Sequence, residues 1–351
     1  MNYSSGRLSS SRTFFNKKHG DTNMGDIEAK ASLRSSLFQL KEIGAIIGLL
    51  TIMAIFSIIA PHFLSWGNLN GVLTMTSELG IIAIGVCMLM VSGEFDLSVG
   101  SVFAVVPMVG ALLSNAGVPF FIAFLLALVV GVCIGLFNGF IVLKTGIPSF
   151  IVTLGGLMFY RGIILAVSGG FPIEYVGKDN IVLNMLGSQI PGLGNLRASS
   201  IWLIILTVIF TIILTSTKFG NHTAAVGGNE GTAKAVGINV KRIKYTNFVF
   251  SSVMAGLAGF TMFGRFYSVD PTAGQLHELE AIAACVIGGA LLKGGYGSII
   301  GAFLGAFLIA VLRSGLILAG APSYWYRGFI GVVLVISVIM NTKIRMRIIG
   351  E

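Results

Sequence analysis

Two carboxylates interrupt a long apolar stretch of this chain, in the tract SGEFDLSVGS at residues 92–101. A charged side chain at the centre of a bilayer costs roughly 2.5–3.5 kcal/mol on insertion scales, so Glu94 and Asp96 are expected at an interface or facing a wet cavity. Asp96 and Ser98 are also favoured N-cap residues, and a carboxylate there meets the positive end of the helix dipole. Two interpretations stay open: Asp96 begins the next helix, or the tract is a re-entrant break that lines a pathway.

Other charged residues also fall inside or beside apolar stretches. Arg161 lies within one of them, so we expect its guanidinium to face protein or an aqueous pathway. Arg313 invites the same expectation, or a side chain that snorkels to the outer interface. Glu78, Glu278 and Glu280 are the only candidates for a set of intramembrane carboxylates that could bind a coupling ion.

Motifs of several other chemistries are missing from the sequence. There is no GxxxxGK[ST] phosphate loop, so we expect no nucleotide site in this chain. Neither His222 nor His277 has a second His or Cys at ligand spacing, which favours solvated loop residues over a metal site. No His/Asp/Ser cluster at catalytic spacing falls within the apolar spans, so we expect no cofactor and no enzymatic activity.

A polar island, KFGNHTAAVGGNEGTAKAVGINVKRIKY at residues 218–245, separates two long apolar stretches. The island is too polar to lie in lipid and too short to build a core of its own. Asn229 is a suitable N-cap for a short helix through residue 236, and Gly237 is suitable for its left-handed end. The island is therefore either an ordinary connection or a docking element through which a partner moves both flanking spans.

The elements that position these residues are apolar helices. Of the 351 residues, 55% are hydrophobic and only 11% are charged, whereas soluble domains carry about 25% charged residues. Apolar runs long enough to cross a hydrocarbon core recur along nearly the whole chain. We expect an all-α, polytopic membrane protein with about ten spans, two of them short or broken near Gly93 and Gly294. The expected spans are residues 43–60, 69–91, 98–114, 119–143, 148–168, 200–216, 247–265, 278–292, 297–318 and 325–341.

Lys and Arg residues gather on one side of these spans. The basic tail 1–41, the island and the basic tail 343–351 share that side, while the other side clearly holds only Lys178 and Arg197. The net charge of +9 therefore indicates topology and not a nucleic-acid partner. Both termini and a coupling segment, 217–246, are expected in the cytoplasm. One permease domain, 42–342, is expected between a disordered basic tail, 1–41, and a basic tail, 343–351. The loop 169–199 is then external; it either holds a small surface helix that meets a partner or simply covers the spans.

Two stretches of the chain that run into these breaks are similar to each other. Glu78-Leu79 and Glu278-Leu279 each open an apolar stretch that runs into a Gly-rich break and a further span. Many transporters consist of internal repeats. The similarity is therefore either a repeat, whose two copies run in the same direction by the span count, or a chance match of low-complexity apolar sequence. Glycines spaced four apart, at 131, 135 and 139 and at 297, 301 and 305, favour close helix packing in lipid over a ligand site.

Three ordered motifs resemble one family of transporters. GEFDLSVGSV looks like the GGxDLSVGS signature of permease subunits of ribose/xylose-class ABC importers. AVGGNEGTAKAVGINVKRIK resembles the cytoplasmic coupling segment of that family, and LEAIAACVIGGALLKGGYGSIIGAFLGAFLI resembles its later Gly-rich block. The resemblance covers roughly residues 63–338. The chain departs from the family pattern at Glu94, where a small or apolar residue is usual, and at Glu280, where Asp is common.

The resemblance implies an assembly. Two permeases, identical or related, would form the pathway in the cytoplasmic membrane of a bacterium, and two cytosolic ATPase subunits, which hold ATP and Mg²⁺, would dock on the island. An external binding protein would deliver a monosaccharide or a similarly small polar solute. The coupling residues carried over are Gly227, Asn229, Ala233 and Gly237.

A sugar pathway requires neutral hydrogen-bonding groups and aromatic faces beside the breaks. The candidate lining residues are Phe95, Asp96, Ser98, Asn138, Phe150 and Thr153. The alternative is a self-sufficient secondary transporter or facilitator, which would need its own coupling-ion carboxylates.

Overall fold

The computed structural model describes residues 43–177, 180–322, 325–326, 328–332, 335–336 and 339. The expected tails 1–41 and 343–351, together with Lys178, lie outside the described residues, so the division into one domain and two tails stays a prediction. The described helices are α2 (Ile43–Ile59), α3 (Trp66–Val91), α4 (Val99–Asn115), α5 (Phe120–Thr145), α6 (Ser149–Ser168), α7 (Ile181–Gly187), α8 (Ala198–Ser216), α9 (Lys218–Gly228), α10 (Glu230–Ala235), α11 (Val240–Phe266), α12 (His277–Ile287) and α13 (Ile299–Leu318), and the described strands are β1 (Ile173–Glu174) and β2 (Ser268–Val269).

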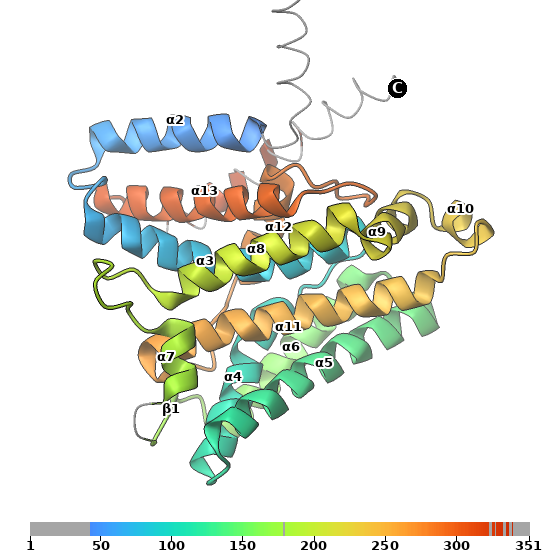
Figure 1. Ribbon diagram of the computed structural model, residues 1–351, viewed down its shortest axis with the longest axis horizontal. Helices are drawn as coiled ribbons and strands as arrows, with labels where there is room; N and C mark the ends of the chain where they lie inside the picture. The colour runs from blue at the N-terminus through green and yellow to red at the C-terminus, as the bar shows by residue number, and fades with distance from the viewer. Residues whose placement is uncertain are drawn as a thin grey trace, which may run out of the picture.

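The long helices lie side by side, with α9 and α10 at one end of the molecule and α7 and β1 at the other (Figure 1). Six described helices, namely α3, α5, α6, α8, α11 and α13, are long and apolar enough to cross a membrane, and α2 and α4 are shorter apolar helices. Helical backbone is also described within residues 325–339, where the last span is expected. The expected all-α, polytopic membrane fold is confirmed.

Two helix boundaries differ from the expected spans. The α11 helix begins at Val240, before the expected 247, because the side chain of Asn239 accepts the amide of Arg242 and starts the helix within a polar stretch. The α12 helix ends at Ile287, short of the expected 292, because Gly289 adopts a left-handed φ of 90° and turns the chain. The expected spans were drawn from apolar composition, which reveals neither the cap at Asn239 nor the turn at Gly289.

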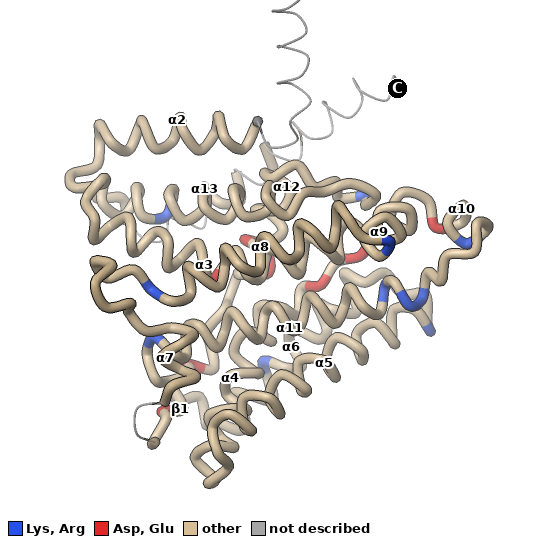
Figure 2. The backbone as a smooth tube through the Cα atoms, viewed as in Figure 1, with Lys and Arg blue, Asp and Glu red and all other residues tan. Residues whose placement is uncertain are grey.

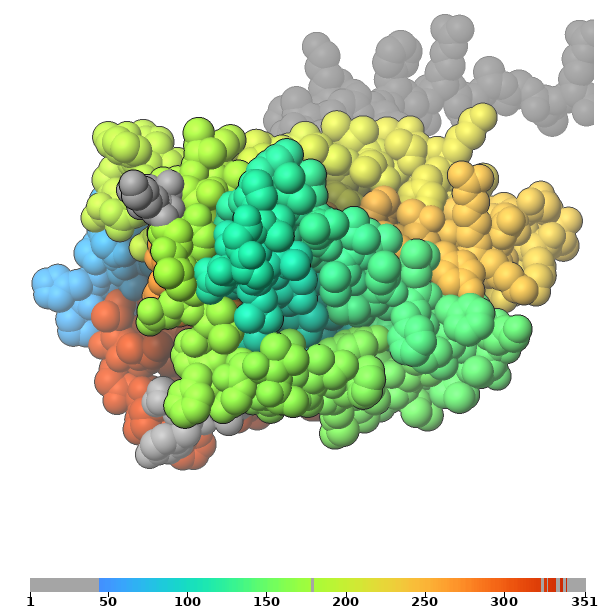
Figure 3. Space-filling view, turned by 90° about the horizontal axis from the view of Figure 1, so that it is seen from below, coloured from blue at the N-terminus to red at the C-terminus, as the bar shows by residue number. Residues whose placement is uncertain are grey.

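The core of the molecule is formed by α3 and α11. Their most apolar windows are 83% and 72% buried, compared with 17% for α6, and α11 packs against α3, α4, α5 and α7. The α5 and α6 helices cover the face seen from below, with the yellow island at its right-hand end (Figure 3). Their outward residues include Phe137, Phe159 and Ile163, which is the apolar surface that lipid or another membrane subunit covers.

Glycines allow the closest helix contacts, as the four-residue spacing predicts. A Cβ on Gly135 of α5 would lie 2.7 Å from the Phe248 carbonyl oxygen of α11, and one on Gly305 of α13 would lie 2.0 Å from the Ala284 oxygen of α12. Only glycine fits at these two positions without a shift of the neighbouring helix.

The loop 169–199, which was expected to be external, contains a short helix and a short strand. The apolar stretch expected near residues 181–186 forms α7, whose N-cap is Asn180. The β1 strand pairs antiparallel with β2, so that Ile173 lies opposite Val269 and the loop is attached to the segment that follows α11. The α7 helix packs against α11 and α8.

Basic residues mark one end of the bundle. Lys and Arg gather around α9, α10, the start of α11 and the end of α5 (Figure 2). Both helix breaks also reach this end, because the Gly295 amide after α12 donates to the Val91 oxygen at the end of α3, at 2.9 Å. The stretches that begin at Glu78 and Glu278 therefore both run toward the island, which agrees with the expected common direction. The repeat itself stays a prediction.

Candidate functional site

Asp96 organises the first break. Its Oδ1 accepts the amide of Ser98 at 2.9 Å and the hydroxyl of Ser98 at 2.6 Å, while the N-cap of α4 is Ser98, which makes no side-chain cap bond. Asp96 therefore does not cap α4 directly but fixes the turn that precedes it. Its second oxygen, Oδ2, is buried and has no hydrogen-bond partner among the described residues.

A buried hydrogen-bond chain continues from this turn across two further helices. The Ser98 hydroxyl accepts from Asn138 Nδ2 of α5 at 2.9 Å, and Asn138 Oδ1 accepts the hydroxyl of Tyr160 of α6 at 2.7 Å. Because each group satisfies the next, the chain holds the start of α4 against α5 and α6. Sequence reasoning identified Asp96, Ser98 and Asn138 but missed Tyr160, which had no signal beyond its place beside Arg161.

Hydroxyl groups of α6 accept the backbone amides of the break. Thr153 Oγ1 accepts the Leu97 amide at 3.0 Å, and Ser149 Oγ accepts the Phe95 amide at 3.0 Å. The structure thus brings together Phe95, Asp96, Ser98, Asn138 and Thr153. Phe150 stands apart from them, with 52% of its surface exposed on α6. That these six residues line a solute pathway stays a prediction.

An ion-pair cluster ties the break to the island. Lys244 Nζ of α11 lies 2.6 Å from Glu94 Oε1 and 2.9 Å from Glu230 Oε2 of α10. The side chains of Lys244 and Glu94 are only 10% and 12% exposed, so their pairing is far less screened than a surface pair. The hydrogen bond from Lys244 lowers the pKa of Glu230 below its ordinary value. No local sequence pattern connects Glu94 with a residue 150 positions away.

The last turn of α9 meets both breaks through backbone atoms, most of them of glycines, in a contact that we call the glycine junction (Gly93, Gly227, Gly228, Gly294 and Gly295). A Cβ on Gly227 would lie 1.9 Å from the Val91 oxygen and 2.6 Å from the Gly295 nitrogen. A Cβ on Gly294 would lie 2.7 Å from the Gly93 Cα. Three segments distant in the sequence therefore touch where no side chain intervenes.

The island itself is a small folded unit. Asn229 Oδ1 accepts the Thr232 amide at 2.9 Å and caps α10, and Gly237 adopts a left-handed φ of 85°. Both predicted caps are confirmed. Ala233 is 2% exposed and packs in a cluster with Val226, Val240 and Ile243. The structure thus places Gly227 in the glycine junction, Asn229 at a cap and Ala233 in the cluster.

Arg161 faces protein, as expected. Its guanidinium donates to the Gly100 oxygen at 2.7 Å, to the Ala273 oxygen at 2.8 Å and to the Pro271 oxygen. Three carbonyls from two segments therefore converge on one side chain of α6 and accept hydrogen bonds from its guanidinium.

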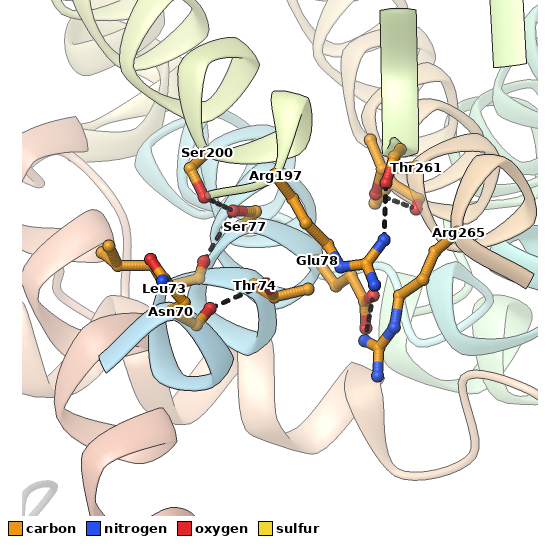
Figure 4. A network of polar contacts seen from close by, with 11 residues as sticks. Asn70, Leu73, Thr74, Ser77, Glu78, Arg197, Ser200, Thr261 and Arg265 are labelled. Carbon is orange, nitrogen blue, oxygen red and sulfur yellow. Dashed lines mark hydrogen bonds and ion pairs between the residues drawn. The ribbon is translucent and has the colours of Figure 1, made fainter. Parts of the chain in front are cut away.

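The three candidate coupling-ion carboxylates do not pair with one another. Glu78 lies between α3 and α11, with Oε1 3.1 Å from Arg265 Nη1 and with Arg197 beside it (Figure 4). Glu280 Oε1 accepts the Tyr326 hydroxyl at 3.0 Å. His277, expected in a solvated loop, instead begins α12 with its ring 5.1 Å from that of Phe103. Among the described residues, no group of three or more His, Cys, Asp or Glu side chains is placed to hold a metal ion.

Comparisons with known proteins agree on one class. The family model described as branched-chain amino acid transport system / permease component matches residues 68–338. Ribose import permease protein RbsC of Bacillus subtilis is 34% identical over 307 residues, which cover 87% of this chain and 94% of the relative. RbsC of Escherichia coli is 35% identical over 308 residues, with the same coverage. The xylose transport system permease protein XylH of Escherichia coli is 32% identical over 342 residues, which cover 81% of this chain and 87% of the relative.

Proposed function

The chain belongs to the family of branched-chain amino acid transport system permease components and is the membrane-spanning permease subunit of an ABC importer, and we propose that its solute is a monosaccharide or a similarly small polar molecule. The observation that carries the solute class is that relatives aligned over most of the chain are named for ribose import and xylose transport. The matched residues, 68–338, include both breaks and the island.

Two cytosolic ATPase subunits would dock on the island and hold ATP and Mg²⁺. The residues proposed to couple them are Gly227, Asn229, Ala233 and Gly237. Three observations support this role: the island folds as a unit, its caps are satisfied, and it touches both breaks through the glycine junction. A second permease subunit, identical or related, would complete the pathway.

Placement in a bacterial cytoplasmic membrane, with the island and both termini in the cytoplasm, is part of the same proposal. The gathering of Lys and Arg at the island end supports a cytoplasmic island (Figure 2). The opposite end, with α7, β1 and β2, would then face the external binding protein. The short helix α7 is the element there that a binding protein could press toward α11.

Transport would proceed by a shift between outward-open and inward-open states. When ATP draws the two ATPase subunits together, each island follows, and the glycine junction carries the displacement to both breaks. Five of the proposed lining residues, Phe95, Asp96, Ser98, Asn138 and Thr153, lie on or beside the first break and would become accessible in another state of the cycle. The sixth, Phe150, is already exposed on α6. A self-sufficient secondary transporter is not favoured, because Glu78 is paired with Arg265 and not with another carboxylate.

Reconstitution tests this proposal. The full chain, reconstituted with the ATPase subunits and the external binding protein of its source bacterium, should import radiolabelled D-ribose or D-xylose into proteoliposomes only when ATP and both partners are present. Uptake by the chain alone, driven by an ion gradient or by no energy source, would disprove the proposal.

A further inference from the structure

A partly open cavity of about 190 Å³ lies where residues of α3, α4, α11, α12 and α13 meet. Roughly 10–15 Å³ is enough for one water molecule, so the cavity has room for a small organic molecule. Its lining combines charged, polar and aromatic side chains from several elements, chiefly Glu78, Phe103, His277, Glu280, Arg313 and Tyr326. None of these six residues belongs to the predicted pathway-lining set or to the predicted ATPase-coupling set, although Glu78 and Glu280 were candidate coupling-ion carboxylates.

Arg313 has unused hydrogen-bonding capacity in this cavity. Its guanidinium stacks on Tyr326, with Cζ 5.2 Å from the ring centroid, and it makes no hydrogen bond or ion pair with another described residue. A guanidinium carries five donors in a fixed plane. An arginine within a membrane span normally pairs with a carboxylate or carbonyls, as Arg161 does, so Arg313 is placed to donate to an occupant of the cavity.

Acceptors stand around the same space. Glu280 Oε1 is held by the Tyr326 hydroxyl at 3.0 Å, and Glu280 Oε2 lies 3.4 Å from His277 Nδ1. His277 Nδ1 is buried and has no hydrogen-bond partner among the described residues. The ring of Phe103 packs against His277 and supplies an apolar wall.

The mixture of charges selects the class of occupant. Arg313 would repel a cation, and the carboxylates of Glu78 and Glu280 would repel an anion. A neutral molecule with several hydroxyl groups can donate to the carboxylate and accept from the guanidinium, while its C–H face packs on an aromatic ring. We propose that this cavity is a solute-binding site for a neutral polyol the size of a monosaccharide. This inference rests on the proposed function and gives it a location.

Binding here would also be linked to the island. Glu280 stands in the first turn of α12, and the other end of α12 leads into the break that forms the glycine junction. An occupant that draws Glu280 and Arg313 together acts on α12 and α13, the two helices on either side of that break. Occupancy and ATPase docking would therefore bias the same element.

Cysteine protection tests binding without any partner. Ala310 lines the cavity, and Cys133 is the exposed cysteine among the described residues. In a Cys133→Ser background in nanodiscs, D-ribose or D-xylose should slow the reaction of Ala310→Cys with a small hydrophilic methanethiosulfonate. The same sugars should leave Leu193→Cys, in the exposed 169–199 loop, unaffected. Equal labelling of Ala310→Cys with and without sugar, or protection by Na⁺ instead, would overturn the proposal.

Transport by the whole importer provides the second test. Arg313→Met and Glu280→Gln should each reduce sugar uptake about tenfold or more, because loss of a charged hydrogen-bonding partner commonly exceeds one factor of ten in affinity. Ser314→Ala is the matched control, since Ser314 bonds Asn68 and does not line the cavity. Binding-protein-stimulated ATPase activity verifies assembly of each variant. A wild-type importer with neither import nor stimulated ATPase would refute the proposed function, whereas uptake at the wild-type level in assembled Glu280→Gln would refute this site alone.

Discussion

Gly227 and Gly228 are neighbours in the last turn of α9, yet a methyl group added to each meets different surroundings. On Gly227, the new Cβ would lie 1.9 Å from the Val91 oxygen and 2.6 Å from the Gly295 nitrogen. On Gly228, the nearest atom is the Gly295 Cα at 3.9 Å, which is ordinary van der Waals contact. The two alanine variants therefore add the same atoms to the same helix and differ only in how closely the new methyl group approaches the backbone of the two breaks.

The energetic difference follows from what must move. Overpacking a close contact costs typically about 1–3 kcal/mol, and Gly227→Ala belongs at the upper end because its obstacles are backbone atoms joined by the Gly295–Val91 hydrogen bond. Gly228→Ala should be neutral or slightly stabilising, since alanine is favoured over glycine in helices by up to about 1 kcal/mol. We expect Gly227→Ala to lower the free energy of unfolding by about 3 kcal/mol relative to Gly228→Ala.

The assay has two readouts on purified full chain. Chemical unfolding in detergent micelles measures the stability difference, and reconstituted importer measures uptake per ATP hydrolysed. Because the added methyl group separates α9 from both breaks, Gly227→Ala should hydrolyse ATP with little uptake, while Gly228→Ala should match the wild type. If both variants unfold at the same denaturant concentration and transport equally, the glycine junction does not transmit movement.

Three further predictions concern the island. Lys244→Met should destabilise the chain by about 3 kcal/mol, because it leaves the Glu94 carboxylate without its partner and largely buried. Glu230→Gln, at the more exposed partner, should cost less than about 1 kcal/mol. Similar unfolding curves for the two variants would contradict this ranking. The pKa of Glu230 is lowered from 4.5, so its bond to Lys244 stabilises the fold fully above pH 4.5 and loses that contribution as the pH falls through the lowered pKa. Acid unfolding of Glu230→Gln should lack this loss of stability, and identical acid-unfolding curves for Glu230→Gln and the wild type would exclude the contribution. Asn229→Ala should cost about 1 kcal/mol by removing the cap of α10, measured as faster hydrogen exchange in α10, with unchanged exchange as the contrary result.

Local chemistry was enough to predict most of the apolar helices and both caps of α10. The ends of α3 to α6 fall close to the expected ends because those spans are limited by polar or glycine residues next to apolar runs. Asn229 and Gly237 perform the predicted local roles because capping depends only on neighbouring backbone groups. The polar first turns of α11 were missed because they carry Lys241, Arg242 and Lys244, which an apolar window excludes.

Contacts between distant segments were beyond such reasoning. Gly93 and Gly294 were identified as breaks, but nothing in either tract indicates that they touch. The candidate lining residues were chosen for polarity, and in this structure Asp96, Ser98 and Thr153 are fully buried and bonded within the protein. Glu78 and Glu280 were grouped from the sequence only as candidate coupling-ion carboxylates. Their common cavity with Arg313 was not predicted, because the three side chains approach one another only through packing of three helices.

Arg161 has a mechanical consequence for the transport cycle. The carbonyls of Pro271 and Ala273 lie outside any helix, and the side chain of Arg161 supplies the donors that a further helical turn would have given them. If α6 tilted away by itself, the Pro271 and Ala273 oxygens would lose the donors that Arg161 supplies. The α6 helix and the segment 270–276 should therefore travel as one rigid body, and the flexing of each cycle must occur elsewhere.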